Sequence, residues 1–423
     1  MILSADIRIR IKKEHFANLI YEFYSRSCDI HRLELVDTED GEDIYLIETV
    51  YTSRHNYNNL IDILKKNSDK YTVISQKNSI EEKIRGGLLQ IKSRNPVENT
   101  NDYNMNILGA TELIKDKIAS GEWEQYSSVS KNAAVISGIN SSEELSNADI
   151  LNIYSETEKE ALTISRFAGL NAIPLIIEYS NTDDIIKTIN RIESGFSIIK
   201  ISRTAADDLL IADRIAAGIS KPFISREFDE IPLYLISAAI MIIKKYELNP
   251  ADTTVGFIGL NSTTLRCSSL FDKTGFFKVL GNDNSDKNMM EFEKFGGMAT
   301  TPDNILLNSD ILFLKTDSLE DIDLGRIRPG QFVILFGENK NVDLKTIKQR
   351  GAREIILIDN NSVNSIHPGI TSGVLKSVPK RLNDQVLIHT AKKLSLLMGK
   401  EFTMPDIFTD IHEKLASIIC ETN

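Results

Sequence analysis

Residues 254–264 read TVGFIGLNSTT, and this stretch decides the fold of the chain. A run of strand-forming residues, 254–258, ends at Gly259, a residue suited to a tight turn. Further strand-like runs follow, separated by lengths of chain that suit helices or loops: residues 276–280, 311–314, 332–336 and 354–358. Strands that alternate with helices predict a parallel, doubly wound sheet of the α/β class.

The segments around this sheet support the same prediction. Residues 333–335 and 355–357 are continuous apolar runs, which is typical of parallel strands buried on both faces. Residues 233–244 form a helical segment that is apolar nearly all round, so we expect a central helix. Two more helices, at 384–397 and 407–419, are expected to close the chain.

Composition and charge limit the possible functions. The chain has 423 residues, which corresponds to two or three domains, and a net charge of −11 with a pI of about 5.2. This balance disfavours nucleic acid and anionic membranes as partners. The longest apolar run, residues 233–243, is shorter than the roughly 20 residues needed to span a bilayer. Charged residues close to the start argue against a signal peptide.

The cysteines point to a reducing compartment. Cys28, Cys267 and Cys420 lie far apart and form neither a disulfide framework nor a zinc-binding spacing. We therefore expect a cytoplasmic protein with reduced thiols.

The first 77 residues predict a small separate domain. Residues 5–11 alternate apolar and polar side chains, as a strand with one buried face does. The next segments are typical in turn of a helix, two strands, a helix and a strand: residues 15–27, 31–36, 44–51, 57–66 and 71–75. This βαββαβ order is the ferredoxin-like arrangement.

This domain resembles an ACT domain, with CDI at residues 28–30 before the second strand and His55 at the start of the second helix. The resemblance implies a module that binds amino acids and regulates an attached enzyme. ACT domains that bind amino acids usually carry glycine in the loop after the first strand, where this chain has KKEH at residues 12–15. Ligand sensing and dimerisation alone therefore both remain open.

Polar residues 78–87 are the expected linker, and the chain beyond them resembles a malic enzyme. Four stretches are similar to motifs of that family in the same order: LLQIKSRNP at 88–96, RFAGLNAIP at 166–174, the segment 183–196, and HPGITSGVL at 367–375. The resemblance implies a substrate domain at 78–249, a Rossmann-like domain at 250–423, and a homo-oligomer.

Residues that carry the chemistry of malic enzymes are replaced in this chain. The family's Tyr in AYTPG aligns with Ile107, and its catalytic Lys aligns with Glu160. The first Asp of the family's HDDQHGTA aligns with Arg226. Since Ile cannot move a proton, the resemblance implies that the acid and the base of the reaction are both lost.

The family's metal ligands are also altered. The two carboxylates of NLED align with Ser202 and Arg203, and the second Asp of HDDQHGTA aligns with Glu227. Because Mg²⁺ and Mn²⁺ prefer several oxygen ligands, we expect no metal, and instead an ion pair of Glu227 with Arg203 or Arg226. A shifted register that recruits the two Asp residues at 207–208 is the alternative.

The dinucleotide signature is incomplete. Against the pattern G-x-G-x-x-G, Phe257 and Ser262 replace the first and third glycines and only Gly259 remains. Asp283, offset from the end of the expected strand 276–280, is the remaining candidate to contact a ribose. We therefore expect a Rossmann-like architecture without a cofactor.

Together these losses predict a regulatory or ligand-sensing pseudoenzyme. Its old cleft would keep Lys200, Arg203 and Arg226, which could hold an anionic metabolite such as an organic acid, and the ACT-like domain could take an amino acid. One alternative is an active NAD(P)-dependent malic enzyme that uses Mg²⁺ or Mn²⁺ with displaced catalytic groups. A lyase or another activity on the same scaffold is a third. The six histidines form no catalytic motif and are expected mostly at the surface or at strand ends.

Overall fold

The structure is a computed structural model that describes residues 3–39, 41–77, 88–89, 95–122, 126–204, 210–276, 278–337, 342–377, 381–399 and 401–421. It divides into two compact units, Met1–Ile91 and Lys92–Asn423. The expected linker at 78–87 lies outside the described residues.

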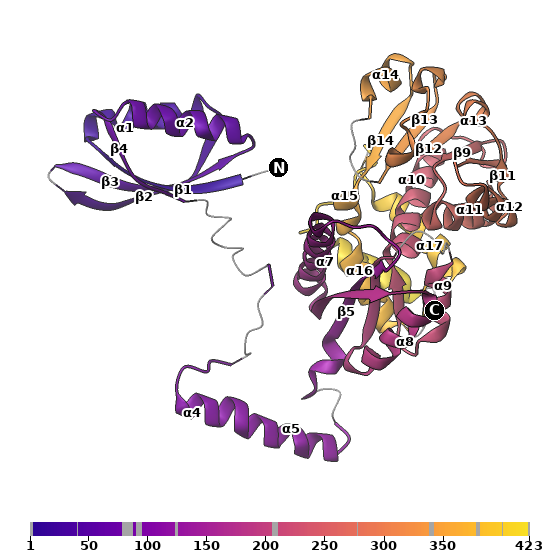
Figure 1. Ribbon diagram of the computed structural model, residues 1–423, viewed down its shortest axis with the longest axis horizontal. Coiled ribbons are helices and arrows are strands. Elements are labelled where there is room, and N and C mark those ends of the chain that lie inside the picture. Colours follow the sequence, from indigo (N-terminus) through magenta and orange to yellow (C-terminus); the bar gives the residue numbers. More distant parts are fainter. Residues whose placement is uncertain are drawn as a thin grey trace. The chain divides into compact units, whose positions relative to one another are not determined.

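The first unit has the expected βαββαβ order. Its sheet runs β2-β3-β1-β4 with antiparallel pairing, and both helices cover one face of the sheet (Figure 1). The core between them contains alternate residues of β1 together with Leu19, Phe23, Leu60 and Leu64. The elements are β1 Leu3–Ile11, α1 Phe16–Tyr24, β2 Cys28–Glu39, β3 Glu42–Tyr51, α2 Arg54–Lys66 and β4 Tyr71–Lys77. This is a ferredoxin-like fold, and its assignment as an ACT domain remains a prediction.

The second unit begins with a helical segment in which no residue with a described side chain is buried. Its elements are α4 Thr100–Tyr103, η2 Asn104–Gly109 and α5 Ala110–Ala119.

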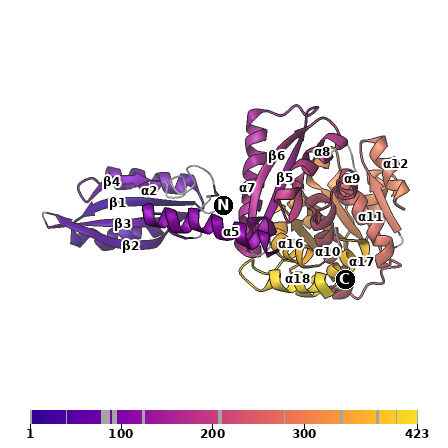
Figure 2. The ribbon, with the colours of Figure 1, turned by 90° about the horizontal axis from the view of Figure 1, so that it is seen from below.

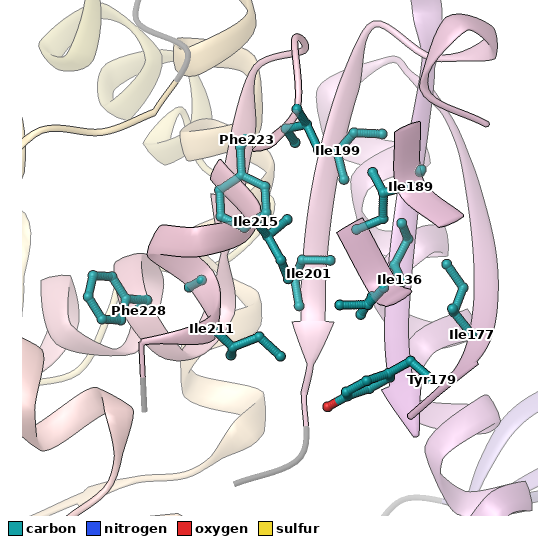
Figure 3. Close-up of a cluster of buried hydrophobic side chains, with 14 of the residues drawn as sticks. Ile136, Ile177, Tyr179, Ile189, Ile199, Ile201, Ile211, Ile215, Phe223 and Phe228 are labelled. Carbon is teal, nitrogen blue, oxygen red and sulfur yellow. The ribbon is translucent and has the colours of Figure 1, made fainter. Parts of the chain in front are cut away.

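A parallel sheet of order β6-β5-β7-β8 follows, with α7 along β5 and β6 (Figure 2). Isoleucines of β5, β6 and β7 pack against α8, α9 and Phe223 in its core (Figure 3). The elements are β5 Asn132–Asn140, α7 Asn147–Ala168, β6 Asn171–Tyr179, α8 Thr182–Ile192, β7 Ile198–Arg203, α9 Ile211–Gly218 and β8 Phe223–Ser225.

A π-helical turn, η5 Arg226–Glu230, leads from β8 into the central helix α10 Ile231–Lys245, which is buried along most of its length as expected. The second sheet comes next and runs β11-β10-β9-β12-β13-β14, all parallel. This is the 3-2-1-4-5-6 order of a doubly wound dinucleotide-binding fold. The chain reverses its winding between β9 and β12, where such folds form a crevice for ligands.

Helices follow the strands of this sheet along the chain, and a group of helices forms the C-terminal part. The elements of this region are given in chain order. They are β9 Thr254–Ile258, α11 Ser262–Thr274, β10 Lys278–Asn282, α12 Asp286–Lys294, β11 Met298–Ala299, α13 Pro302–Asn308, β12 Ile311–Lys315, β13 Phe332–Phe336, α14 Leu344–Gln349, β14 Glu354–Ile358, α15 Asn360–Asn364, α16 His367–Lys376, α17 Asp384–Leu397 and α18 Ile411–Glu421. No helix among the described residues is long and apolar enough to cross a membrane.

Several boundaries differ from the sequence prediction, such as β2, which was expected at 31–36, and two of the differences have a clear local cause. The strand expected at 276–280 is β10 at 278–282, because Gly275 ends α11 in the left-handed conformation and Phe276 still bonds back to Phe271. The last helix begins at Ile411 and not at 407, because Asp406 first forms a turn with Thr409.

Candidate functional site

A pocket of about 600 Å³ opens at the carboxyl ends of strands from both sheets of the second unit. Its walls include Ser202 and Arg203 from β7, residues 261–263 at the start of α11, and Lys315 from β12. The pocket therefore lies where a doubly wound fold binds its ligands.

Directly beneath this pocket lies a cluster of fully buried charged side chains. The ammonium of Lys200 (β7) lies 2.6 Å from Glu160 Oε1 (α7) and also contacts Glu230 (η5). His367 Nδ1 (α16) lies 2.9 Å from Glu230 Oε2. All four side chains have zero exposure, so each must be satisfied from within the protein.

The charges in this cluster are balanced. Burial alone would raise the pKa of Glu160 and Glu230, but the neighbouring cations, Lys200 first, outweigh it and hold both carboxyl pKa values below their ordinary range. Burial, followed by the charge of Lys200, lowers the pKa of His367, so its ring is neutral at pH 7. The ion pairs therefore join two carboxylates to Lys200 and to Arg226, whose Nη1 lies 3.3 Å from Glu160 Oε2.

Glu160 also connects the cluster to the pocket, because it accepts a hydrogen bond from the Ser202 hydroxyl in the pocket wall. Glu160 and Arg226, which the resemblance assigns to the positions of the family's Lys and Asp, are thus in contact. Lys200 is not among the described residues that line the pocket.

The expected ion pairs of Glu227 are not what the structure shows. Arg203 pairs with Glu143 in the loop after β5 and also donates to the backbone oxygen of Gly138 at 2.9 Å. Arg226 turns toward Glu160 instead. Glu227 accepts a hydrogen bond from Ser262 at the start of α11. Both arginines therefore form ion pairs with a glutamate, as expected, but the partners are Glu143 and Glu160 and not Glu227.

The residues that the resemblance assigns to the family's metal positions do not fit a divalent cation. Ser202, Arg203 and Glu227 offer one carboxylate beside guanidinium groups, which repel a cation. Within the described part of the chain, one group of at least three suitable ligands exists, formed by Glu160, Glu230 and His367. The ammonium of Lys200 already lies among these ligands. The alternative register with 207–208 lies outside the described residues.

The turn after β9 corrects the assignment of the glycine pattern. β9 ends at Ile258, and Gly259, with φ of +88°, begins the turn, so Gly259 is the first position of the pattern. The second and third positions are then Asn261 and Thr264, which cap α11 reciprocally. Phe257, expected at the first position, is buried inside β9.

Asp283 immediately follows β10, at the place where doubly wound folds carry an acid for the ribose. Its carboxylate accepts hydrogen bonds from Leu260 N at 2.7 Å and Ser285 N at 2.9 Å. Gly259 and Asp283 are therefore brought together at one turn. Ile107 lies on η2, is 37% exposed, and is not among the described residues of the pocket wall.

Sequence reasoning missed Glu143, Glu230 and His367. The histidines are expected mostly at the surface or at strand ends, and the exceptions are His367, which is fully buried, and His412, which is 8% exposed. One signal was present: Lys200 lies within the apolar run IIKI at 198–201. A lysine in a buried strand requires buried carboxylates as partners.

No family model matches the chain. Among curated proteins it is 23% identical over 344 residues to an NAD-dependent malic enzyme of Bacillus subtilis, covering 79% of this chain and 77% of the relative. It is 19% identical over 372 residues to an NAD-dependent malic enzyme of Geobacillus stearothermophilus, covering 79% and 76%.

Solved structures of malic enzymes also resemble this chain. A malic enzyme of Entamoeba histolytica matches with a TM-score of 0.68 at 15% identity, covering 81% of this chain and 79% of that one. An NAD-dependent malic enzyme of Thermotoga maritima matches with a TM-score of 0.67 at 14% identity, covering 82% and 100%. The fold is that of malic enzymes. The similarity to a malic enzyme that the sequence indicated is thereby confirmed at the level of the fold.

The expectation that no cofactor is involved is wrong. Both curated relatives, matched over most of this chain, are named as NAD-dependent enzymes. An incomplete glycine pattern, with Gly259 as its one glycine in either register, is therefore too weak a ground to expect no cofactor.

Proposed function

We propose that this chain is a malic-enzyme-like sensor that binds a nicotinamide dinucleotide and a small organic acid but does not decarboxylate malate oxidatively. The observation that carries the proposal is the buried contact between Glu160 and Arg226, with Lys200 on the other side of Glu160. It stands where the resemblance implies the family's Lys and Asp.

The chemistry of this contact opposes catalysis. A general base must accept a proton, and its pKa should lie near the working pH. The pKa of Glu160 is lowered by its cationic neighbours, which outweigh the effect of burial, so its carboxylate is a poor proton acceptor. Polarisation of a hydroxy acid by a bound metal ion also requires carboxylate ligands. The resemblance assigns two of those positions to Ser202 and Arg203, which carry no carboxylate.

Binding of a dinucleotide is supported by the 3-2-1-4-5-6 sheet and by the names of the relatives. The turn at Gly259 lets the backbone approach a pyrophosphate, and Asp283 stands at the ribose position. When bound, a nicotinamide dinucleotide supplies a hydride acceptor.

An organic acid would contact Arg203 and Arg226, both in the pocket wall. Each guanidinium carries several N–H donors, so it can bind a ligand carboxylate while keeping its pair with Glu143 or Glu160. Lys200 would act only from beneath, through Glu160.

An active NAD-dependent malate oxidoreductase is the second candidate, favoured by the names of the curated relatives. A single assay separates the two. The full-length protein is incubated with NAD, malate and Mn²⁺, and NADH formation is followed at 340 nm. We expect no turnover above a boiled control, while NADH binding is detected by its fluorescence. Turnover that survives repeated purification supports the second candidate.

For the first unit we propose a regulatory role as an ACT-like domain that senses an amino acid or dimerises. A thermal-shift screen of amino acids and dicarboxylates tests sensing. Stabilisation by one amino acid supports it, whereas a flat response together with a dimer in sedimentation leaves association alone.

A further inference from the structure

Glu227 holds an unusual position at the junction of the two sheets of the second unit. Its Oε2 lies 3.3 Å from the hydroxyl of Ser262, the first residue of α11. Its backbone oxygen accepts a hydrogen bond of 2.8 Å from the hydroxyl of Thr263. Two adjacent residues of the first turn of α11 therefore hold this glutamate in the wall of the pocket.

Cationic side chains line the same pocket as this carboxyl group. Burial raises the pKa of Glu227, and the cations that act against this effect are Arg203, Arg226 and Lys315. All three line the pocket. Glu227 thus shares the pocket wall with three cations and lies where that wall meets the N-terminus of a 13-residue helix.

In a doubly wound fold, this convergence is where the phosphates of a dinucleotide bind. Here the place already holds a carboxyl group that belongs to the protein. Asn261 and Thr264 also use part of the helix N-terminus for their reciprocal cap.

We infer that Glu227 is an internal anion that competes with the phosphates of a bound dinucleotide and keeps their affinity low. The inference rests on the proposed dinucleotide binding. An incoming pyrophosphate must either displace the Glu227 carboxylate from Ser262 or bind beside it against charge repulsion. The protein therefore responds only to high concentrations of dinucleotide.

The test is Glu227→Gln, which keeps the shape and the acceptor for Ser262 and removes the charge. NADH binding is titrated by fluorescence, and ADP-ribose and adenosine by calorimetry, all in EDTA so that no divalent metal contributes. We expect NADH and ADP-ribose to bind at least tenfold more tightly than to the native protein. The affinity for adenosine, which has no phosphate, should stay within twofold.

The matched control is Asp317→Asn. Asp317 also lines the pocket, but it pairs with Lys315 at 2.7 Å, and no hydrogen bond or ion pair among the described residues joins it to α11. A general loss of negative charge would raise the affinity of both variants equally, whereas competition predicts at most a threefold gain for Asp317→Asn. If Glu227→Gln does not fold, as judged by circular dichroism, Glu227→Ala serves with the same expectations.

The outcomes separate this inference from the proposed function. The competition is wrong if the native protein binds NADH and Glu227→Gln binds it no more tightly. It is also wrong if the affinity of Glu227→Gln for adenosine rises as much as its affinity for NADH. In both cases dinucleotide binding stands. If neither protein binds NADH or ADP-ribose, dinucleotide binding itself is wrong and the inference falls with it.

Discussion

Lys200 lies among three isoleucines in β7, and its ammonium is shared between Glu160 and Glu230. Removing one partner of a buried ion pair leaves charge without compensation in a medium of low dielectric constant. We expect Lys200→Met to lower the free energy of unfolding by about 3–5 kcal/mol, as measured by urea denaturation followed by circular dichroism.

Lys294→Met is the matched control for this substitution. Lys294 pairs with Glu291 at 2.6 Å, but 67% of its side chain is exposed. Exposed pairs contribute about 0–1 kcal/mol, so this variant should unfold almost as the native protein does. Equal stability of the two variants would show that Glu160 and Glu230 do not depend on the lysine.

Asp229 provides a second prediction for a single residue, this time of pH dependence. The side chain is fully buried; its Oδ2 accepts a hydrogen bond from Ser225 N at 2.7 Å, and its Oδ1 has no partner among the described residues. Burial, opposed first by Arg381, raises the pKa of Asp229 to about 6.

A carboxyl group whose pKa is higher in the folded state than in the unfolded state lowers the stability of the protein as the pH rises. The loss begins at the pKa of the unfolded state and is complete above the pKa of the folded state. Asp229→Asn removes this cost, so it should stabilise the protein by about 1 kcal/mol more at pH 8 than at pH 5 in urea unfolding. The exposed Asp321→Asn should show no such difference. A benefit that is the same at both pH values would contradict the shift.

At the level of elements, the turn between β9 and α11 depends on Gly259 for two reasons. Its φ of +88° disfavours any side chain, and an added Cβ would lie 2.6 Å from Ser318 Oγ and 2.7 Å from Lys315 Cβ. Gly330 has a similar φ of +87° but open space around an added Cβ. Comparing the two separates backbone strain from steric contact.

We expect Gly330→Ala to cost about 1 kcal/mol in the free energy of unfolding, as a left-handed alanine does. Gly259→Ala should cost about 2–4 kcal/mol, because overpacking adds to the strain. Both values come from chemical denaturation. Equal costs for the two variants would mean that the loop at Ser318 moves away freely.

Elements with a strong pattern were predicted well from the sequence. The strands at 254–258, 332–336 and 354–358 and the helix at 384–397 have the expected bounds, because long apolar runs flanked by turn residues leave few alternatives. The two-residue strand β11 and the π-helical turn η5 were missed. Such short elements are stabilised by their neighbours and have no periodicity of their own.

The fold of the whole molecule could be predicted, but the partners within its site could not. Arg226 and Glu160 are separated by 66 positions, and Lys200 and His367 by 167. Side-chain contacts over such separations depend on how α7, β7, η5 and α16 pack. The sequence could indicate that charges lie near the cleft, while their pairing follows only from the assembled sheets.

The whole molecule also allows a prediction about its two units. Every residue of the hydrophobic core formed by β1, α1, α2 and the strands around them comes from residues 3–73. A unit with its own core should fold alone, and a domain of this size buries enough apolar surface to do so. We expect residues 1–91, expressed separately, to give a cooperative thermal transition by circular dichroism.

Residues 92–423 should likewise fold, and they should bind NADH with the affinity of the full chain, since the pocket and its buried charge cluster belong to this unit alone. Scanning calorimetry of the full chain should then show two transitions that match those of the fragments. A single transition, or a fragment 1–91 without cooperative unfolding, would show that the first unit depends on the second for its stability. In that case a ligand of the ACT-like domain would also change the stability of the second unit. If the two transitions are independent, we expect a regulatory signal to pass by association between chains.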